Sequence, residues 1–438
     1  MKMNNRIMSL IAAMVFGMST FAASVETDRE WYLAGEAMKV SVTADDALIA
    51  YAELCDTHGM AAGVVLSLDG GEGKGIIELP SDLHSGYYVL SVYTRHNANV
   101  SQRLIAVVNP LRKSEDDDIE WVQIASTDSL SYPESEDSSS NLQFFRSAEG
   151  LLLPTGRKNS SIFNVRETEG HIIKARVRNV YDGKTFRGSQ IRPSLGIIGK
   201  QIHYFEGKMV NDSMAVFYTF GIHGKQPLVL SASSSTGESL PIEMISPFAN
   251  LLPKELPHLV FHYQRSEVEA RSLDMQRHQM AIQPAKRELK MGDLSDDTAE
   301  DVVPMDYDDS VFGTKPYLSY NLDEYRQFFT VREVLIEYVN CVSNRKVNGV
   351  AQLVVRKDSD PYDTSWPTLV LIDGMPVNDI ERLLNYDARR VHYINIYSGQ
   401  YTFGKGIYNG ILSFVTRSGR LTNYPTETNS QYLVYQFP

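Results

Sequence analysis

Two histidines four positions apart are the first side chains in this sequence that could do chemistry. His258 and His262 stand in "HLVFH", a spacing that on a helix brings two imidazoles to one zinc ion. A zinc protease would show the His-Glu-x-x-His form, and the preceding "LLPKELPH" carries prolines that disfavour a helix. We therefore predict that this pair holds no metal.

A glycine-rich stretch at 69–75, "DGGEGKG", has some likeness to a phosphate-binding loop. Such a loop needs Gly-Lys followed by Ser or Thr at the start of a helix. Here Gly75 follows Lys74 and the strand-like "IIEL" comes next, so we predict the tip of a β-hairpin. The acidic clusters "EDDD" and "YDDS" lack the spacing of a calcium-binding EF-hand, and we predict that both are solvated.

Asp373 is the most conspicuous acid, at the tip of "TLVLIDGMPVNDIERLL". A carboxylate at the end of a buried strand invites a catalytic interpretation. An Asp-Gly pair is also a common turn, because Asp tolerates the bend and Gly374 supplies a positive φ. We predict that Asp373 turns the chain. The Gly-x-Ser-x-Gly turn of the α/β-hydrolases is absent, and we predict no catalytic, cofactor-binding or metal-binding residue and no cofactor.

The elements around these side chains are those of an ordinary globular chain. Of its 438 residues, 43% are hydrophobic and 22% are charged, which predicts several domains with cores of their own. The net charge of −12 argues against nucleic acid as a partner.

Residues 1–23 have the features of a secretory signal peptide. Lys2 and Arg6 precede the apolar run "IMSLIAAMVFGM", and "STFAAS" supplies small residues for cleavage. The run is too short to span a bilayer as a mature helix, and no Cys follows it to carry a lipid. We expect an exported protein of the periplasm or the outer membrane. The two cysteines, Cys55 and Cys341, are predicted to be buried thiols in different domains.

The fold class predicted is mainly β. Residues 24–110 show short alternating strands separated by Gly and Pro turns, typical of a β-sandwich, and residues 141–248 repeat the pattern. Between them, residues 111–140 have the acidic, Ser-rich composition of a linker.

The remaining third of the chain changes class. Residues 249–318 are predicted to be a partly helical, acidic connector. Residues 319–422 carry a capping box, Thr330 with Glu333, and an order of helices and strands that predicts a small α/β domain. Residues 423–438 are predicted to be a tail or an edge strand.

Parts of the two sandwiches resemble known families. Residues 27–110 resemble the Ig-like MG2-type macroglobulin domain of secreted Bacteroidetes proteins. The residues that carry the resemblance are Tyr32, Ala34-Gly35-Glu36, Leu79-Pro80, Ser85-Gly86-Tyr87 and Tyr93-Thr94. Residues 171–236 are similar to carboxypeptidase-regulatory-like or transthyretin-like β domains.

Residues 319–420 resemble the plug domain of TonB-dependent outer-membrane receptors. The matching segments are Leu369 to Val377 with its Asp-Gly turn, Val391 to Gly399, and Gly410-Ile411-Leu412. A receptor continues into several hundred residues of barrel strands, whereas this chain ends at Pro438. We therefore expect no transport by this chain alone.

These features predict a non-enzymatic modular protein of the cell envelope. It would bind or dock a protein partner, in an outer-membrane complex, through its sandwich and plug-like modules. Two alternatives stay open: a macroglobulin-like protease-binding inhibitor, and an enzyme whose site is assembled only in three dimensions. The 24 Tyr residues favour protein or sugar contacts where they are exposed, and core packing where they are not.

Overall fold

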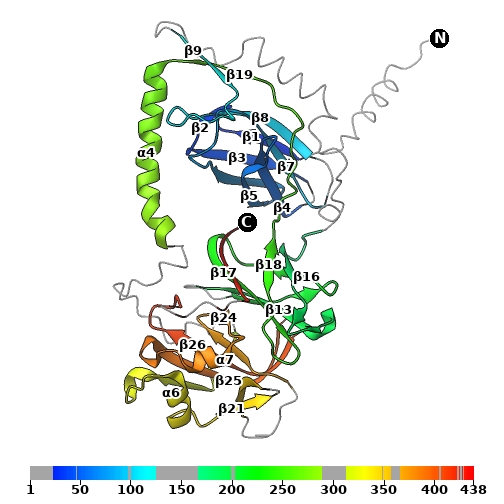
Figure 1. Ribbon diagram of the computed structural model, residues 1–438, viewed down its shortest axis with the longest axis vertical. Coiled ribbons are helices and arrows are strands. Elements are labelled where there is room, and N and C mark those ends of the chain that lie inside the picture. Colours follow the sequence, from blue (N-terminus) through cyan, green and yellow to red (C-terminus); the bar gives the residue numbers. More distant parts are fainter. Residues whose placement is uncertain are drawn as a thin grey trace, which may run out of the picture. The chain divides into compact units, whose positions relative to one another are not determined.

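The computed structural model has a mainly β fold, as the sequence predicts, in two compact units (Figure 1). Unit 1 takes Met1–Thr168 and Phe248–Gln279, and unit 2 takes Glu169–Pro247 and Met280–Phe437. The residues that the structure describes are 23–45, 47–96, 100–124, 166–198, 203–288, 312–347, 349–356, 366–403, 406–421, 424, 427 and 429–438. Residues 1–22 of the predicted signal peptide lie outside them.

Unit 1 contains the first sandwich, made of two sheets that share one core. One sheet has the strand order β1-β3-β6, and the other has β2-β8-β7-β4-β5. Alternation on β3 turns Met38, Val40 and Val42 inward, where they meet Tyr88 and Leu90. The strands are β1 (Ser24–Thr27), β2 (Trp31–Leu33), β3 (Ala37–Thr43), β4 (Ile49–Cys55), β5 (Met60–Ser67), β6 (Glu72–Glu78), β7 (Gly86–Tyr93) and β8 (Val100–Val108).

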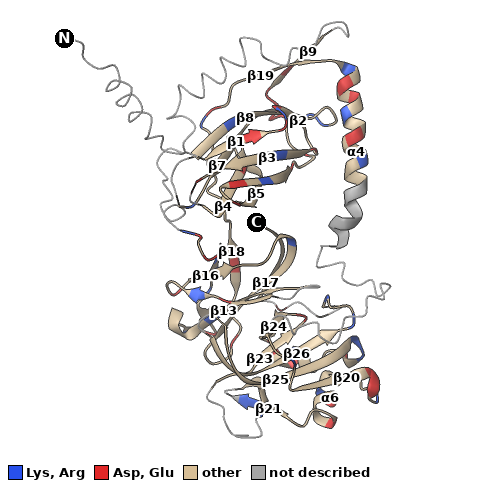
Figure 2. Ribbon diagram, turned by 180° about the vertical axis from the view of Figure 1, so that it is seen from behind, with Lys and Arg blue, Asp and Glu red and all other residues tan. Residues whose placement is uncertain are grey.

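A second layer of unit 1 comes from the segment predicted to be a connector. β19 (Leu259–Tyr263) pairs in parallel with β9 (Ile119–Gln123), and the helix α4 (Arg265–Glu288) follows. Lys, Arg, Asp and Glu alternate along the described part of α4 (Figure 2). β9 lies inside residues 111–140, which the sequence predicts to be a linker. The short apolar run there forms a strand because it pairs with β19, which lies far along the chain. Residues 125–140 lie outside the described part.

Unit 2 opens with the second sandwich, again two sheets around a shared core. Their strand orders are β15-β16-β10-β18 and β14-β13-β17-β27. β27 (Gln431–Phe437) comes from the C-terminal segment and forms an edge strand beside β17. The others are β10 (His171–Val177), β13 (Ile191–Ile197), β14 (His203–Glu206), β15 (Lys208–Met209), β16 (Met214–Thr219), β17 (Gly224–Ser234) and β18 (Ile242–Ile245), with the small hairpin β11 (Val180–Tyr181) and β12 (Lys184–Thr185) and the 3-10 turn η1 (Gly188–Gln190).

The rest of unit 2 is a module built on the five-stranded sheet β20-β25-β26-β23-β24. Two short helices, α6 (Val331–Glu337) and α7 (Ile380–Leu384), share its core. The predicted capping box at Thr330 and Glu333 is confirmed. The strands are β20 (Leu318–Asn321), β23 (Leu369–Ile372), β24 (Met375–Pro376), β25 (Val391–Phe403) and β26 (Gly406–Thr416), with the hairpin β21 (Val342–Val347) and β22 (Val350–Val355) and the 3-10 turns η2 (Leu322–Glu324) and η3 (Ala388–Arg390).

The module and the second sandwich belong to one compact unit, whereas the sequence predicts residues 319–422 as a domain apart. Ile198 and Val229 of the sandwich join the module's apolar core. Gly196 of β13 lies so close to the β23–β24 turn that a Cβ there would meet the Gly374 carbonyl oxygen at 2.6 Å. Only glycine allows this approach, and the sequence around it does not say which segment will approach.

Two further predictions can be placed on the described residues. Cys55 is buried and Cys341 partly buried, each as a free thiol. Among the helices described here, none has the length and apolarity to cross a membrane.

Candidate functional site

Asp373 occupies the predicted turn, and its carboxylate is fully engaged there. Asp373 and Gly374 have φ values of 46° and 83° and join β23 to β24. The side chain is 1% exposed. It accepts hydrogen bonds from the Thr416 amide at 2.7 Å, the Thr416 hydroxyl at 2.5 Å and the Leu421 amide at 2.8 Å. Asp373 therefore ties the turn to the end of β26.

The other stretches weighed in the sequence also serve the fold. Gly70 and Gly71 have positive φ at a hairpin tip before β6, as predicted for 69–75. His262 lies on the strand β19 rather than on a helix, and His258 Nδ1 pairs with Asp118 Oδ1 at 2.5 Å. Asp117 accepts two backbone amides at 2.6 and 2.8 Å. The "YDDS" cluster, 307–310, lies outside the described residues.

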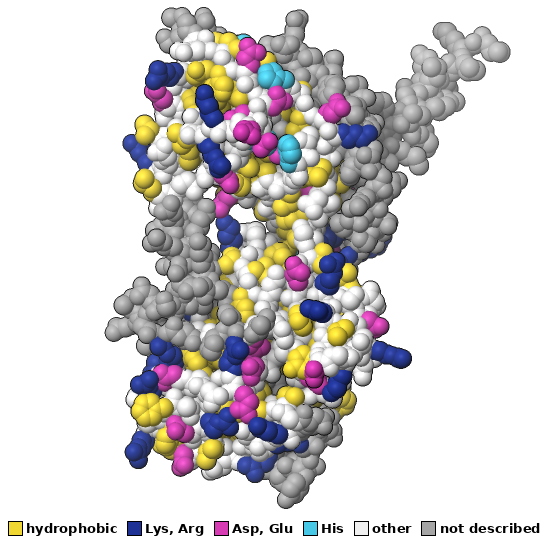
Figure 3. Space-filling view, in the orientation of Figure 1, with side chains coloured by type: hydrophobic (Ala, Val, Ile, Leu, Met, Phe, Trp, Pro, Cys, Tyr) yellow, Lys and Arg dark blue, Asp and Glu magenta, His cyan; other side chains and the backbone are white. Residues whose placement is uncertain are grey.

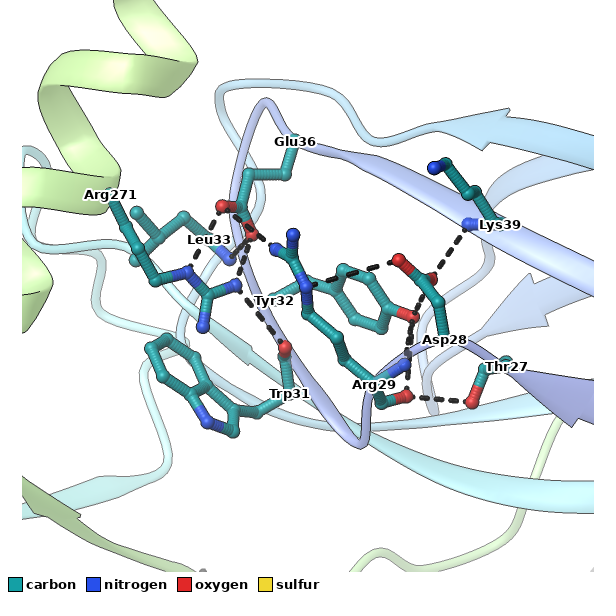
Figure 4. Close-up of polar contacts among 9 residues, drawn as sticks. All are labelled: Thr27, Asp28, Arg29, Trp31, Tyr32, Leu33, Glu36, Lys39 and Arg271. Carbon is teal, nitrogen blue, oxygen red and sulfur yellow. Dashed lines mark hydrogen bonds and ion pairs between the residues drawn. The ribbon is translucent and has the colours of Figure 1, made fainter. Parts of the chain in front are cut away.

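Two of the residues that carry the macroglobulin resemblance, Tyr32 and Glu36, belong to the corner between β2 and β3 (Figure 4). The Tyr32 hydroxyl donates to Asp28 Oδ1 at 2.6 Å, and burial together with that carboxylate raises the pKa of Tyr32. Glu36 accepts the Leu33 amide at 2.8 Å across the Gly35 turn. The bonds of Tyr32 and Glu36 within the corner fix the shape of this turn.

Helix α4 docks on that same corner. Arg271 donates to both carboxylate oxygens of Glu36, at 3.2 and 2.6 Å, and its guanidinium lies 3.6 Å from the centre of the Trp31 ring (Figure 4). One turn later Met275 Sδ lies against Gly35, and Gln279 donates to the Gly35 carbonyl at 2.5 Å. Spacing of four residues places these three side chains on one face of the helix.

A buried carboxylate holds the segment that follows β18 against the first sandwich. Glu53 on β4 is 0% exposed. It accepts the Leu251 amide at 2.5 Å, the Asn250 amide at 3.1 Å and the Tyr93 hydroxyl at 3.2 Å. Burial raises the pKa of Glu53, while these hydrogen bonds act in the opposite direction.

A surface with different chemistry surrounds helix α6 of the module. Thr330 caps the helix, which buries Val331, Val334 and Leu335 in the module's core. The same helical phase turns Ile336 outward, 70% exposed, and leaves Phe329, before the cap, 71% exposed. Large apolar side chains of this exposure are candidates for contact with another molecule.

A row of half-buried aromatic rings extends this surface. Tyr338 at the end of α6 lies between Tyr325 and Phe328, with ring centres 4.6 and 5.4 Å away. Tyr320 continues the row beyond Tyr325 at 6.1 Å. The rings keep one another in place, so their exposed edges form a surface that is rigid before any partner arrives.

An arginine completes the surface on the Phe329 side. Asp387 receives two bonds from the Arg389 guanidinium, at 2.9 and 2.8 Å, and this contact lowers the pKa of Asp387. The guanidinium lies 5.3 Å from the centre of the Phe329 ring. Where α6 lies, yellow hydrophobic side chains reach the surface beside dark blue Lys and Arg (Figure 3).

A small pocket of about 140 Å³ opens on the other side of α6, against the hairpin β21–β22. Its inner wall is apolar, and its edge carries Arg and Asn side chains. The lining residues are Arg332, Leu335, Ile336, Val339, Asn340, Val342, Asn344, Leu353, Arg356 and Leu384. We call Phe329, Ile336, the ring row Tyr325–Phe328–Tyr338 and this pocket together the α6 face.

The α6 face was not predicted as a binding surface, although its helix was predicted from the sequence. The signal for the surface lies in the phase of that helix. Once Thr330 is the cap and Val331, Val334 and Leu335 face the core, position 336 must face outward, and an isoleucine there is unexpected for a purely structural helix. The ring row could not be found in this way, because Tyr325 and Tyr338 meet only after the chain turns back.

No protein-family model matches the sequence, and no curated protein matches it. Among solved structures, the chain is similar to a biofilm-associated protein BSP domain, with 10% identity, a TM-score of 0.17, and coverage of 53% of this chain and 30% of that one. A Salmonella alpha-2-macroglobulin mutant gives 10% identity, a TM-score of 0.19, and coverage of 53% and 15%.

The tandem Ig domains A164-A165 of titin give 9% identity, a TM-score of 0.15, and coverage of 55% of this chain and 98% of that one. This chain spans less than a third of the length of the biofilm-associated protein domain and of the macroglobulin mutant. TM-scores of this size support no conclusion about the fold or the function of this chain.

Proposed function

We propose that this protein is a non-enzymatic modular protein of the bacterial cell envelope that docks a protein partner through its α6 face. The observation that carries the proposal is the composition of that face. Exposed Phe, Tyr and Ile next to Arg is the composition enriched at the centres of protein interfaces.

The pocket beside α6 defines what the partner must present. A volume of about 140 Å³ accommodates one aromatic ring or one branched aliphatic side chain. Arg332 and Arg356 at its edge offer donors for backbone carbonyls of the segment that carries this side chain. The partner is therefore a protein with an exposed apolar anchor, and the ring row contacts the surface around that anchor.

The non-enzymatic part of the proposal rests on how the buried acids are used. Asp373, Glu53 and Glu36 each accept hydrogen bonds from groups that fix a turn, a returning segment or a helix. Each such bond restrains the carboxylate where it lies, and a general acid or base needs to reach a substrate instead.

Two sequence features support the proposed location in the envelope. Residues 1–23 predict export, and the resemblance of residues 319–420 to a receptor plug implies an outer-membrane assembly as the partner. Fractionation of the producing cell tests this directly. Recovery of the protein in the cytoplasm, with residues 1–23 intact, would contradict it.

Docking is tested by site-specific photo-cross-linking. A photoreactive amino acid at position 329 or 336 should capture the same envelope protein, whereas one at position 220 should not. Phe220 is the matched control because it is a phenylalanine of unit 2 with 67% exposure.

The captured protein is then purified and titrated against the chain. Phe329→Asp and Ile336→Asp should each weaken binding at least tenfold, because they place a charge in an apolar contact. Phe220→Asp should bind as the wild type does. Equal affinity for all three variants would refute docking through the α6 face.

A further inference from the structure

A histidine pair and an aspartate meet at one end of the first sandwich. Cys55, the last residue of β4, is paired with Val89 of β7, so the loop after β4 lies beside the segment that enters β7. Asp56 and His58 belong to that loop, and His84 belongs to that segment. His58 and His84 have ring centres 6.2 Å apart, at an interplanar angle of 89°.

One oxygen of Asp56 faces both imidazoles. Asp56 Oδ2 lies 3.6 Å from His84 Nε2 and 3.8 Å from His58 Nδ1. In a tetrahedral zinc site with bonds of 2.0–2.2 Å, neighbouring ligand atoms are about 3.3–3.5 Å apart. The two separations exceed that spacing by only a few tenths of an ångström.

Further contacts hold Asp56 and His84 in this orientation, whereas His58 Nδ1 lies 3.3 Å from the Thr57 hydroxyl, a contact that a bound metal ion would replace. The other oxygen, Asp56 Oδ1, accepts the amides of His58 and Gly59, both at 2.7 Å. His84 Nδ1 lies 3.1 Å from the Tyr88 hydroxyl, which directs Nε2 toward Asp56. Bonds of this kind behind a ligand orient it for a metal ion.

We propose that Asp56, His58 and His84 bind a divalent transition-metal ion of the zinc class. In the geometry that the described residues show, no group of three His, Cys, Asp or Glu side chains could hold a metal ion, and these three are no exception. The site therefore closes on binding, by rotation of the His58 ring. That side chain is 70% exposed, against 18% for His84 and 12% for Asp56, so it is the one that can move.

The chemistry of the set selects the ion. Two imidazoles with one carboxylate suit Zn²⁺, Ni²⁺ or Cu²⁺, and not Mg²⁺ or Ca²⁺, which prefer oxygen ligands alone. Three protein ligands leave a position open for water or for a group from another molecule. The bound ion would link the loop after β4 to the entry of β7.

The test is calorimetric titration of the untagged, EDTA-treated full chain with ZnCl₂. One site of micromolar affinity is expected, weaker as the pH falls because protons compete for the imidazoles. His58→Ala, His84→Ala and Asp56→Asn should each reduce the affinity at least tenfold. Asp56→Asn should fold because asparagine keeps the Oδ1 acceptor that holds the loop. His58→Ala should fold because the His58 side chain is exposed.

His223→Ala, which removes a histidine of unit 2, is the matched control and should bind as the wild type does. Titration with CoCl₂ gives a second readout, since a visible band of a four- or five-coordinate ion should appear in the wild type and be lost in His58→Ala. A wild-type chain that binds no Zn²⁺, or one whose affinity and cobalt band survive all three substitutions, would overturn the proposal.

Discussion

The two sandwiches are both completed by segments from far along the chain, through contacts of different kinds. In unit 1, the segments that return to the first sandwich combine apolar packing with bonds to carboxylates. Leu251 and Phe261 pack against aromatic rings of the sandwich, Glu53 accepts the amides of residues 250 and 251, and Glu36 pairs with Arg271 of α4. Glu167 likewise pairs with buried Arg95 at 3.0 Å. In unit 2, β27 completes the second sandwich with a backbone ladder and buried rings.

The difference has a physical consequence. A strand that adds to an edge contributes hydrogen bonds that carry no net charge, and burial of its side chains is insensitive to pH. A buried carboxylate contributes through a charged acceptor, whose strength depends on its protonation. The contacts that hold the returning segments of the first sandwich should therefore respond more strongly to pH and to charge changes than the contacts that hold β27.

The largest expected effect is at β27. Phe437 is 1% exposed in the core of the second sandwich, so Phe437→Ala should reduce the free energy of unfolding of unit 2 by about 3–5 kcal/mol. Urea unfolding, followed by hydrogen exchange of peptides from β10, β13 and β17, measures this loss. Val434→Ala on the same strand is the control, since Val434 is 39% exposed and should cost less than about 1 kcal/mol.

A smaller effect is expected where α4 meets the first sandwich. Arg271→Ala removes the paired bonds to Glu36 and the contact over Trp31, which together stabilise the docked helix by about 2 kcal/mol. Hydrogen exchange across residues 265–279 should rise accordingly. Arg265→Ala removes an exposed pair with Glu269 and should change exchange little. Equal changes in both variants would contradict the proposed role of Arg271.

The sequence anticipated what local pattern controls. The Asp373-Gly374 turn, the capped helix α6 and the hairpin tip at 69–75 follow from residue types within a few positions. It did not anticipate β9 as a strand or the joining of the module to the second sandwich. Both depend on a partner far along the chain, and no local property of Ile119–Gln123 or Gly196 names that partner.

The candidate surfaces divide in the same way. The outward position of Ile336 could be derived from the phase of α6. The ring row and the meeting of Asp56 and His58 with His84 could not, because each joins segments that are separate in sequence. Motifs of fixed spacing reveal only sites carried by one element, and His262 on the strand β19 shows that a spacing of four residues between histidines does not require a helix.

β27 also makes side-chain polar contacts, and removal of the one between Tyr435 and His171 should cost less still. His171 Nε2 and the Tyr435 hydroxyl are 2.7 Å apart, and the two rings are stacked with centres 5.7 Å apart. Tyr435→Phe keeps the ring and removes the hydroxyl, so the free energy of unfolding of unit 2 should decrease by about 1 kcal/mol. Chemical denaturation shows whether the loss is this small. If Tyr435→Phe reduced the free energy of unfolding as much as Phe437→Ala does, polar contacts would dominate the packing of β27 as well.

The smallest expected effect is a dependence on pH at Glu53. Burial raises the pKa of this carboxyl above its value in the unfolded chain, and bonds from Leu251, Asn250 and Tyr93 offset part of that shift. A raised pKa means that the folded state binds the proton more tightly than the unfolded state does. The stability contributed by protonated Glu53 is thus present below the unfolded pKa and is lost as the pH rises through the folded pKa.

Glu53→Gln removes this titration and keeps the shape of the side chain. The melting temperature of unit 1 in the wild type, minus that in the variant, should therefore decrease as the pH rises from about 4 toward neutrality. Other carboxyls titrate alike in both proteins and cancel in the difference. For unit 2, the same difference in melting temperature should not change with pH. A difference for unit 1 that stays constant or increases with pH would show that Glu53 holds residues 250 and 251 through its hydrogen bonds with no net cost from burial of its charge.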